Sequence, residues 1–228
     1  MDSRTFTEWL HEQAEAEDYW FHRVELFPGY FTAGWSDPWV DKLPYFGLPE
    51  DMCGMRVLDI GCAEGFFSFE AERRGAAEVV AIDAYPDMIR RFNITKVAHG
   101  SQVTAYLASV YDLHPRTFGT FDLVLFFGVL YHLRHPLLAL EKIFNVCTGT
   151  MLMQTATWDD PSVTENAIAH FDPFGIPSGP GGRFMILRSS GARTIHVRSH
   201  SRSRLDSGTL RCSQPIRRSR SSFGQKAS

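Results

Sequence analysis

The chain has 228 residues, of which 44% are hydrophobic and 13% aromatic, a composition typical of one globular α/β domain with short additions. No apolar run approaches the roughly 20 residues that a membrane helix needs. The first thirty residues are acidic and aromatic, unlike the basic and apolar start of a signal peptide. We therefore expect a cytoplasmic protein that does not use a membrane as a partner.

The net charge of −3 hides a difference between two parts of the chain. Lys and Arg number 12 in residues 1–182 and 11 in residues 183–228, whereas Asp and Glu number 25 and 1. The first part therefore carries −13 and the last part +10. A net charge of −13 over residues 1–182 is unfavourable for binding RNA, whose phosphates are bound by Lys and Arg side chains.

The four cysteines include no C-x-x-C pair, which predicts free thiols in a reducing compartment. His132 and His135 have no cysteine or carboxylate at ligand spacing nearby, so we expect no metal site.

In chain order, residues 1–18 are predicted to form an acidic amphipathic helix and residues 19–54 an irregular segment rich in aromatics, here called the lead-in. Strands and helices then alternate. The predicted strands cover residues 55–60, 78–83, 103–108, 121–127 and 150–155, and the predicted helices cover 64–74, 86–98 and 136–146. This order predicts an α/β fold with a doubly wound, mostly parallel, Rossmann-like sheet and helices on both faces. We expect three parts, namely residues 1–54 as a cap, 55–182 as the core and 183–228 as a tail.

The tail departs from this pattern. It is rich in Arg and Ser, with one possible strand at 184–187, and residues 188–228 are predicted to be disordered or poorly packed. One hypothesis is a frameshift or a foreign end near residue 182. The last strands of the sheet would then be altered or missing, and the chain could be an inactive domain. The alternative is a basic arm that binds RNA.

The first motif is Val-Leu-Asp-Ile-Gly-Cys-Ala-Glu-Gly-Phe-Phe at residues 57–67, a strand followed by a glycine turn and a helix. Gly61 and Gly65 permit a tight turn close to a ligand. Asp59 would repel a pyrophosphate but attract an ammonium or sulfonium group. Ala63 replaces the second glycine of a dinucleotide-binding motif, which disfavours a nicotinamide oxidoreductase. The alternative is a glycine-rich turn in another kind of α/β protein.

Two acids follow the next two strands. Asp83 ends the second strand, 22 residues after Gly61, at the spacing of an acid that binds both ribose hydroxyls. Asp112 follows the third strand and could accept a hydrogen bond from an adenine amino group. The alternatives are a turn-forming role for Asp83 and an Asx turn before His114 for Asp112.

The fourth motif is the strand at 121–127, which continues through Gly128 to Tyr131 and His132. Both side chains are candidates for the reacting face of a catalytic site. His132 is the first candidate for a general base, and His22 is the second. The alternative for His132 is a helix-capping or core position.

Together these motifs resemble those of the class I S-adenosylmethionine-dependent methyltransferases, over about residues 55–156. The Gly-Val-Leu-Tyr-His segment at 128–132, the following Pro-Leu-Leu at 136–138, and the lead-in sequence Trp-Phe-His-Arg-Val-Glu-Leu at 20–26 with Gly34-Trp35 are similar to one branch. That branch contains the bacterial tRNA wobble-uridine (mo5U34/cmo5U34) methyltransferases and their relatives.

This resemblance implies S-adenosyl-L-methionine as the cofactor, with carboxy-S-adenosyl-L-methionine, held in part by Tyr131, as the alternative. The branch suggests tRNA as an acceptor, but the charge of −13 over residues 1–182 favours a small-molecule acceptor, with tRNA as the alternative. The resemblance also implies a lead-in that folds over the donor and helps to form the acceptor pocket. The expected donor-binding residues are Asp59, Gly61, Cys62, Ala63, Gly65, Asp83, Ala84, Val110, Asp112, Phe127 and Gly128, and the expected substrate-binding residues are Trp20, His22 and Trp35.

Overall fold

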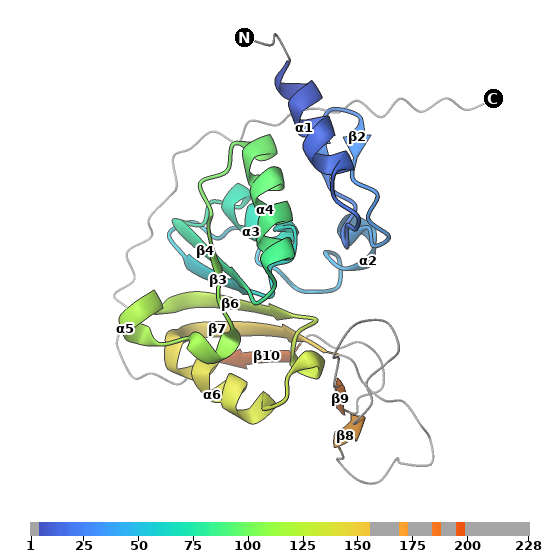
Figure 1. Ribbon diagram of the computed structural model, residues 1–228. Coiled ribbons are helices and arrows are strands. Elements are labelled where there is room, and N and C mark those ends of the chain that lie inside the picture. The colour runs from blue at the N-terminus through green and yellow to red at the C-terminus, as the bar shows by residue number, and fades with distance from the viewer. Residues whose placement is uncertain (1–4, 156–168, 173–183, 188–194, 199–228) are drawn as a thin grey trace, which may run out of the picture.

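The computed structural model describes residues 5–155, 169–172, 184–187 and 195–198. Its centre is a six-stranded sheet in the order β10-β7-β6-β3-β4-β5 (Figure 1). Five of these strands are parallel to one another, namely β3 (Arg56–Ile60), β4 (Glu78–Asp83), β5 (Thr104–Leu107), β6 (Phe121–Phe127) and β7 (Cys147–Gln154). This is the doubly wound, Rossmann-like arrangement that the alternating pattern predicts.

Alternate residues of the central strands supply two separate cores. On β3, Leu58 and Ile60 face one core, and Val57 faces the other. Both faces of such a sheet are covered, so its strands are apolar throughout rather than alternating between apolar and polar. The sequence Val-Leu-Asp-Ile therefore encodes a strand buried on both sides, in which Asp59 is the exception.

Helices cover both faces of the sheet (Figure 1). Helices α3 (Phe66–Arg73) and α4 (Pro86–His99) pack on the face that holds Val57, and α6 (Pro136–Val146) packs on the opposite face. The ends of α4 follow from the sequence, because Pro86 fits the first turn and Gly100 adopts a left-handed conformation with φ 60°. The short elements between these helices and strands are η1 (Val110–Asp112), α5 (Pro115–Phe118) and η2 (Leu130–His132).

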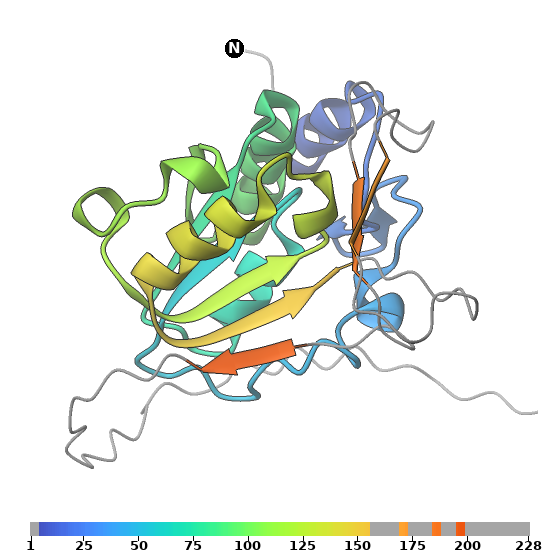
Figure 2. The ribbon, with the colours of Figure 1, turned by 90° about the horizontal axis from the view of Figure 1, so that it is seen from below.

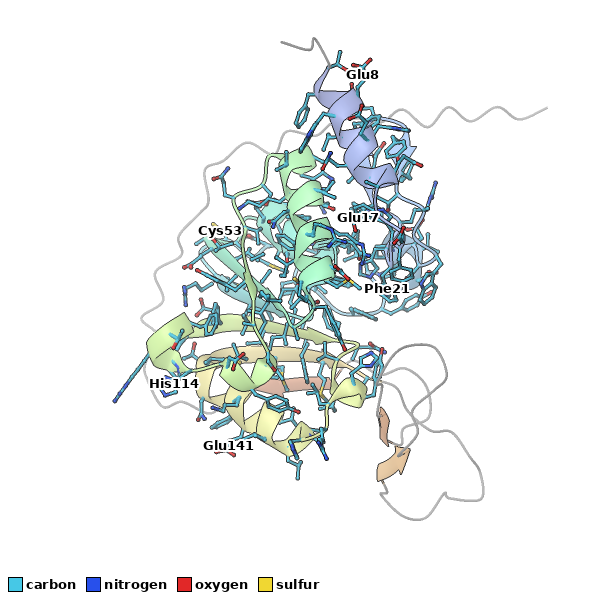
Figure 3. All side chains as sticks on the ribbon, viewed as in Figure 1. Glu8, Glu17, Phe21, Cys53, His114 and Glu141 are labelled. Carbon is cyan, nitrogen blue, oxygen red and sulfur yellow. The ribbon has the colours of Figure 1, made fainter. Side chains whose placement is uncertain are left out.

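The amino-terminal part lies beside α4 (Figure 1). It contains α1 (Phe6–Glu15), β1 (Glu25–Phe27), β2 (Tyr30–Phe31) and α2 (Pro38–Asp41). Thr5 and Glu8 form a capping box that begins α1. Glu17, labelled next to α4 in Figure 3, forms ion pairs with Arg90 and Arg91 of α4. These pairs attach the segment between α1 and the lead-in to the side of the core.

The strands and helices predicted for residues 55–155 are all confirmed, with ends that differ by a few residues. The largest difference is β7, which begins at Cys147 instead of residue 150 because an irregular register at Phe121 and Leu123 of β6 lets the pairing start earlier. The helix α1 is shorter than residues 1–18, and the lead-in forms two short strands and one turn of helix within a segment that we expected to be irregular.

The expectation that residues 188–228 lack packed structure is wrong at β10 (Ile195–Arg198). This strand pairs antiparallel with β7, and Figure 2 shows it running opposite to β6 and β7. The sequence Ile-His-Val-Arg alternates apolar and polar residues, as an edge strand does, but the high Arg and Ser content of its surroundings hides this signal. The sheet therefore extends one strand beyond β7.

The predicted strand at 184–187 is confirmed as β9 (Phe184–Leu187), which pairs with β8 (Ala169–Asp172) and lies next to η2. The rest of the predicted tail lies outside the described residues. Within the described part of the chain, no helix is both long and apolar enough to cross a lipid bilayer.

Candidate active site

A cavity of about 660 Å³ lies at the carboxyl edge of the parallel strands. Residues at or directly after the end of each of the five strands line it, namely Ile60, Asp83, Ala108, Phe127 and Gln154. Ligands of open α/β sheets bind at this edge, and the volume is in the range of sites for small organic molecules.

The glycine turn after β3 forms the floor of the cavity. Gly61 has φ 73° and Gly65 has φ 89°, values that favour glycine. A Cβ on Gly61 would lie 2.3 Å from the side chain of Val129. Ala63 also has a positive φ of 47°, which costs an alanine about 1–2 kcal/mol. The turn that leads into α3 therefore keeps the left-handed conformation even where the second glycine is replaced.

Asp59 is a buried carboxylate that faces the cavity. It is 3% exposed, and its Oδ2 accepts a hydrogen bond of 2.6 Å from the hydroxyl of Ser68 on α3. Burial raises the pKa of Asp59 to about 7, despite the hydrogen bond from Ser68. A bound cation would favour its ionised form, whereas a bound phosphate would not.

Asp83 links the end of β4 to the glycine turn. Its Oδ2 accepts a hydrogen bond of 3.1 Å from the amide of Ala63, and its Oδ1 accepts one of 3.0 Å from the amide of Tyr85. Burial raises the pKa of Asp83 although both amides favour the ionised form. A carboxylate oxygen has two lone pairs, so Asp83 can accept further hydrogen bonds from a ligand in the cavity.

Tyr131 and His132 of η2 both line the cavity, as the fourth motif predicts. Their ring centroids lie 4.3 Å apart. Burial raises the pKa of Tyr131 and lowers that of His132, so it favours the neutral form of both side chains. Gly128, with φ 72°, turns the chain from β6 into this segment.

The lead-in forms the wall opposite the strands. His22 and Trp35 line the cavity, together with Phe21, Lys42 and other lead-in residues. Phe21, labelled in Figure 3, lies where the lead-in contacts the glycine turn. The lead-in is held there by Glu64 of the glycine turn, whose carboxylate accepts hydrogen bonds from the amides of Phe21 (2.6 Å) and His22 (3.3 Å).

Sequence reasoning missed Glu64 and Lys42. Glu64 lies within the first motif and is fully buried. The signal in the sequence was a charged residue in a segment that was expected to be buried, because such residues are rarely buried without a partner. For Lys42 the only signal was its position in an aromatic segment.

Nine of the eleven predicted donor-binding residues line the cavity, namely Asp59, Gly61, Cys62, Ala63, Asp83, Ala84, Val110, Phe127 and Gly128. The other two lie outside its lining. Gly65 begins α3, and a Cβ there would meet the rings of Phe69 and Phe92, so its role is in packing. The Asp112 carboxylate accepts a hydrogen bond of 2.8 Å from the amide of Ser109 and caps η1.

Trp20 is also separated from the cavity. It is buried in a cluster between α1 and α4, and its indole nitrogen donates a hydrogen bond of 3.1 Å to the carbonyl of Ala14. A tryptophan whose polar atom is satisfied in this way is part of a core. We therefore assign it no contact with substrate.

Comparison with known proteins identifies the family. The model of the family described as "Methyltransferase domain" matches residues 52–171, which is more than half of the chain. The chain therefore belongs to this family, as a class I S-adenosylmethionine-dependent methyltransferase domain.

Two curated relatives are similar to part of the chain. A ubiquinone biosynthesis O-methyltransferase of Xanthomonas euvesicatoria pv. vesicatoria is 35% identical over 110 residues, covering 48% of this chain and 44% of that protein. A protein of the same name from Xylella fastidiosa is 32% identical over 116 residues, covering 46% and 47%. The chain thus spans less than half the length of these curated relatives.

Solved structures confirm the fold. The N-terminal domain of EvdMO1, in the presence of SAH and D-fucose, has a TM-score of 0.63 at 21% identity, covering 82% of this chain and 84% of that one. A second structure of the same domain with SAH bound has a TM-score of 0.61 at 23% identity, with the same coverage.

Proposed function

We propose that this chain transfers the methyl group of S-adenosylmethionine to an oxygen atom of a small-molecule acceptor. One observation carries the proposal: a single cavity is lined both by the turn after β3 and by the aromatic lead-in. A donor and an acceptor that bind the same cavity can be held with their reacting atoms aligned, which contributes several kcal/mol to a displacement reaction.

The residues on the strand side fit this donor. Asp83 would bind the ribose hydroxyls, and Asp59 would favour the positive charge of the ligand. The glycine turn brings its backbone to the cavity at Gly61, Cys62 and Ala63. When bound, S-adenosylmethionine supplies a methyl group on a positively charged sulfur. The chain's own residues position it and exclude water.

The lead-in side fits a small acceptor. The aromatic residues Phe21 and Trp35 line the cavity, while Tyr131 and His132 border it from η2. We also propose that residues 1–54 act as a cap on a core formed by residues 55–182, supported by the contacts of Glu64 with the lead-in. The names of the curated relatives, and the SAH and D-fucose of the EvdMO1 structure, support a small molecule with a hydroxyl group.

A tRNA acceptor is the second candidate. The sequence Gly-Val-Leu-Tyr-His at 128–132, with Tyr131 at the cavity, supports it. The charge of −13 over residues 1–182 opposes it, since binding RNA phosphates requires basic side chains.

Calorimetric titration with S-adenosylmethionine tests the proposal, and a separate titration with NAD is the control. We expect binding of S-adenosylmethionine alone, and about a 10- to 100-fold loss of affinity in Asp83→Ala, because a charge-assisted hydrogen bond contributes about 1.5–3 kcal/mol. Asp87→Ala is the matched control, since Asp87 is exposed on α4 and outside the cavity lining. A folded wild-type protein that did not bind S-adenosylmethionine would refute the proposal.

A further inference from the structure

Lys42 brings a positive charge to the lead-in wall of the cavity, where aromatic residues and the carboxylate of Asp41 also line it. It lies directly after α2 and is the one lysine or arginine among the described residues that line the cavity. Its Nζ lies 4.1 Å from the centroid of the Phe21 ring and 2.8 Å from Nε2 of His22. The amine is therefore held at the cavity by a ring face and by an imidazole.

The contact with His22 defines which ring nitrogen carries a proton. While Lys42 is an ammonium it has three donors and no acceptor, so Nε2 of His22 accepts from it and Nδ1 carries the hydrogen. That Nδ1 lies 3.3 Å from Oε2 of the fully buried Glu64. Among the described residues Nδ1 has no hydrogen bond of normal geometry, and the neighbouring Glu64 carboxylate opposes the lowering of the His22 pKa by burial. Glu64, His22 and Lys42 thus form a line from the buried turn to the cavity.

The surroundings of Lys42 place its titration near neutral pH. Burial lowers its pKa to about 8, although the charges of Glu64 and of Asp41 on α2 act in the opposite direction. Burial also lowers the pKa of His22, which keeps the imidazole neutral and able to accept. A side chain whose pKa lies close to the working pH is suited to take up and release protons.

We propose that Lys42 is the base that takes the proton of the acceptor's hydroxyl group, and that His22 and Glu64 are its positioning residues. This inference rests on the proposed methyl transfer. The proton moves from the acceptor oxygen to the neutral amine of Lys42, which becomes an ammonium. The oxygen forms a bond to the methyl carbon, the electron pair of the methyl–sulfur bond stays on sulfur, and Lys42 later releases the proton to water.

The basicity of Lys42 and the aromatic residues around it also indicate the class of acceptor. A phenol, with a pKa of about 10 as in tyrosine, is acidic enough to transfer a proton to an amine like that of Lys42, whereas an aliphatic alcohol is a far weaker acid. A phenol ring also suits a wall that contains Phe21 and Trp35. The structure therefore favours an aromatic acceptor with an ionisable hydroxyl group.

Binding of 4-nitrophenol to the full chain saturated with S-adenosylhomocysteine tests this, because the phenolate absorbs visible light and the phenol does not. We expect the wild type to bind the phenolate in preference to the phenol. Lys42→Met should weaken that binding at least tenfold, with the affinity for S-adenosylhomocysteine unchanged within twofold. Lys142→Met is the matched control, because Lys142 lies on α6 outside the cavity lining.

The outcomes separate the two proposals. One result overturns the role of Lys42 and leaves the methyl-transfer proposal standing: S-adenosylhomocysteine binds, but the phenolate does not bind the wild type, or it binds Lys42→Met as tightly as the wild type. If S-adenosylhomocysteine fails to bind a folded wild type, the methyl-transfer proposal fails, whatever the phenolate does.

The pH dependence of Lys42 acetylation by trace acetic anhydride, followed by mass spectrometry, tests the positioning residues without any ligand. We expect half-maximal labelling near pH 8 in the wild type. Glu64→Gln should shift that midpoint to lower pH, because it removes a charge that favours the ammonium. An unchanged midpoint in a folded Glu64→Gln variant would exclude Glu64 from this role.

Discussion

Replacement of Asp59 by Asn is predicted to stabilise the fold while weakening the binding of donor. Asp59 is buried at the cavity with a hydrogen bond from Ser68, and the Asn side chain has nearly the same shape. In the wild type the folded protein must carry this carboxylate, ionised and desolvated, at pH 8. The amide of the variant has no charge to bury.

The magnitude follows from the pKa. The ordinary pKa of 3.8 and the folded value of about 7 differ by an amount equivalent to about 4 kcal/mol, at about 1.36 kcal/mol per pKa unit. Because the folded pKa is the higher one, the unfolded chain loses its proton first as pH rises. The free energy of unfolding is therefore highest below about pH 4 and falls by this amount as pH rises to about 7. The amide brings two N–H donors, which we expect to offset about 1–2 kcal/mol of the gain. The variant should therefore be more stable than the wild type at pH 8 by about 2–3 kcal/mol.

Urea titrations of the wild type and Asp59→Asn at pH 5 and pH 8 measure this. The variant should be more stable at pH 8, and the difference should shrink at pH 5, where the wild-type carboxyl is mostly protonated. Asp18→Asn, at an exposed position outside the cavity, is the matched control. Calorimetry should show weaker binding of S-adenosylmethionine to Asp59→Asn. An equal difference in unfolding free energy at both pH values would refute the reasoning about burial.

Two further substitutions test the backbone around the cavity in opposite directions. Ala63→Gly should raise the free energy of unfolding by about 0.5–1 kcal/mol, because relief of the positive φ outweighs the added freedom of the unfolded chain; a lower value by urea titration would contradict this. Gly34→Ala should disrupt the packing of the lead-in on itself, and with it the contact of His22 with Glu64, because a Cβ there would lie 2.0 Å from the carbonyl carbon of His22. Hydrogen exchange at the amides of Phe21 and His22 should then increase, and unchanged protection would show that the lead-in adapts.

The order of strands and helices in the core could be read from the sequence because its signals are local. The apolar run before Gly61, the Pro86 and Gly100 that bound α4, and the stretch 121–127 each encode one element through neighbouring residues. The carboxyl ends of parallel strands meet at one edge, so Asp59 and Asp83 could also be assigned to one site. Both of them line the cavity.

Other features depend on contacts between distant segments. Trp20 looks like a pocket aromatic in the sequence, but the packing of α1 on α4 buries it elsewhere. The strand β10 depends on the open edge of β7, which lies about 40 residues earlier in the chain. Its local composition gives little indication of that partner.

The sequence by itself determined the fold class and the identity of the turn after β3, because hydrophobic periodicity and glycine positions act over a few residues. Only the tertiary structure decided that Lys42, His22 and Glu64 form one line at the cavity. These residues belong to two segments of the chain, and the pKa of Lys42 is set by burial and by charges that meet only after the lead-in has folded against the glycine turn.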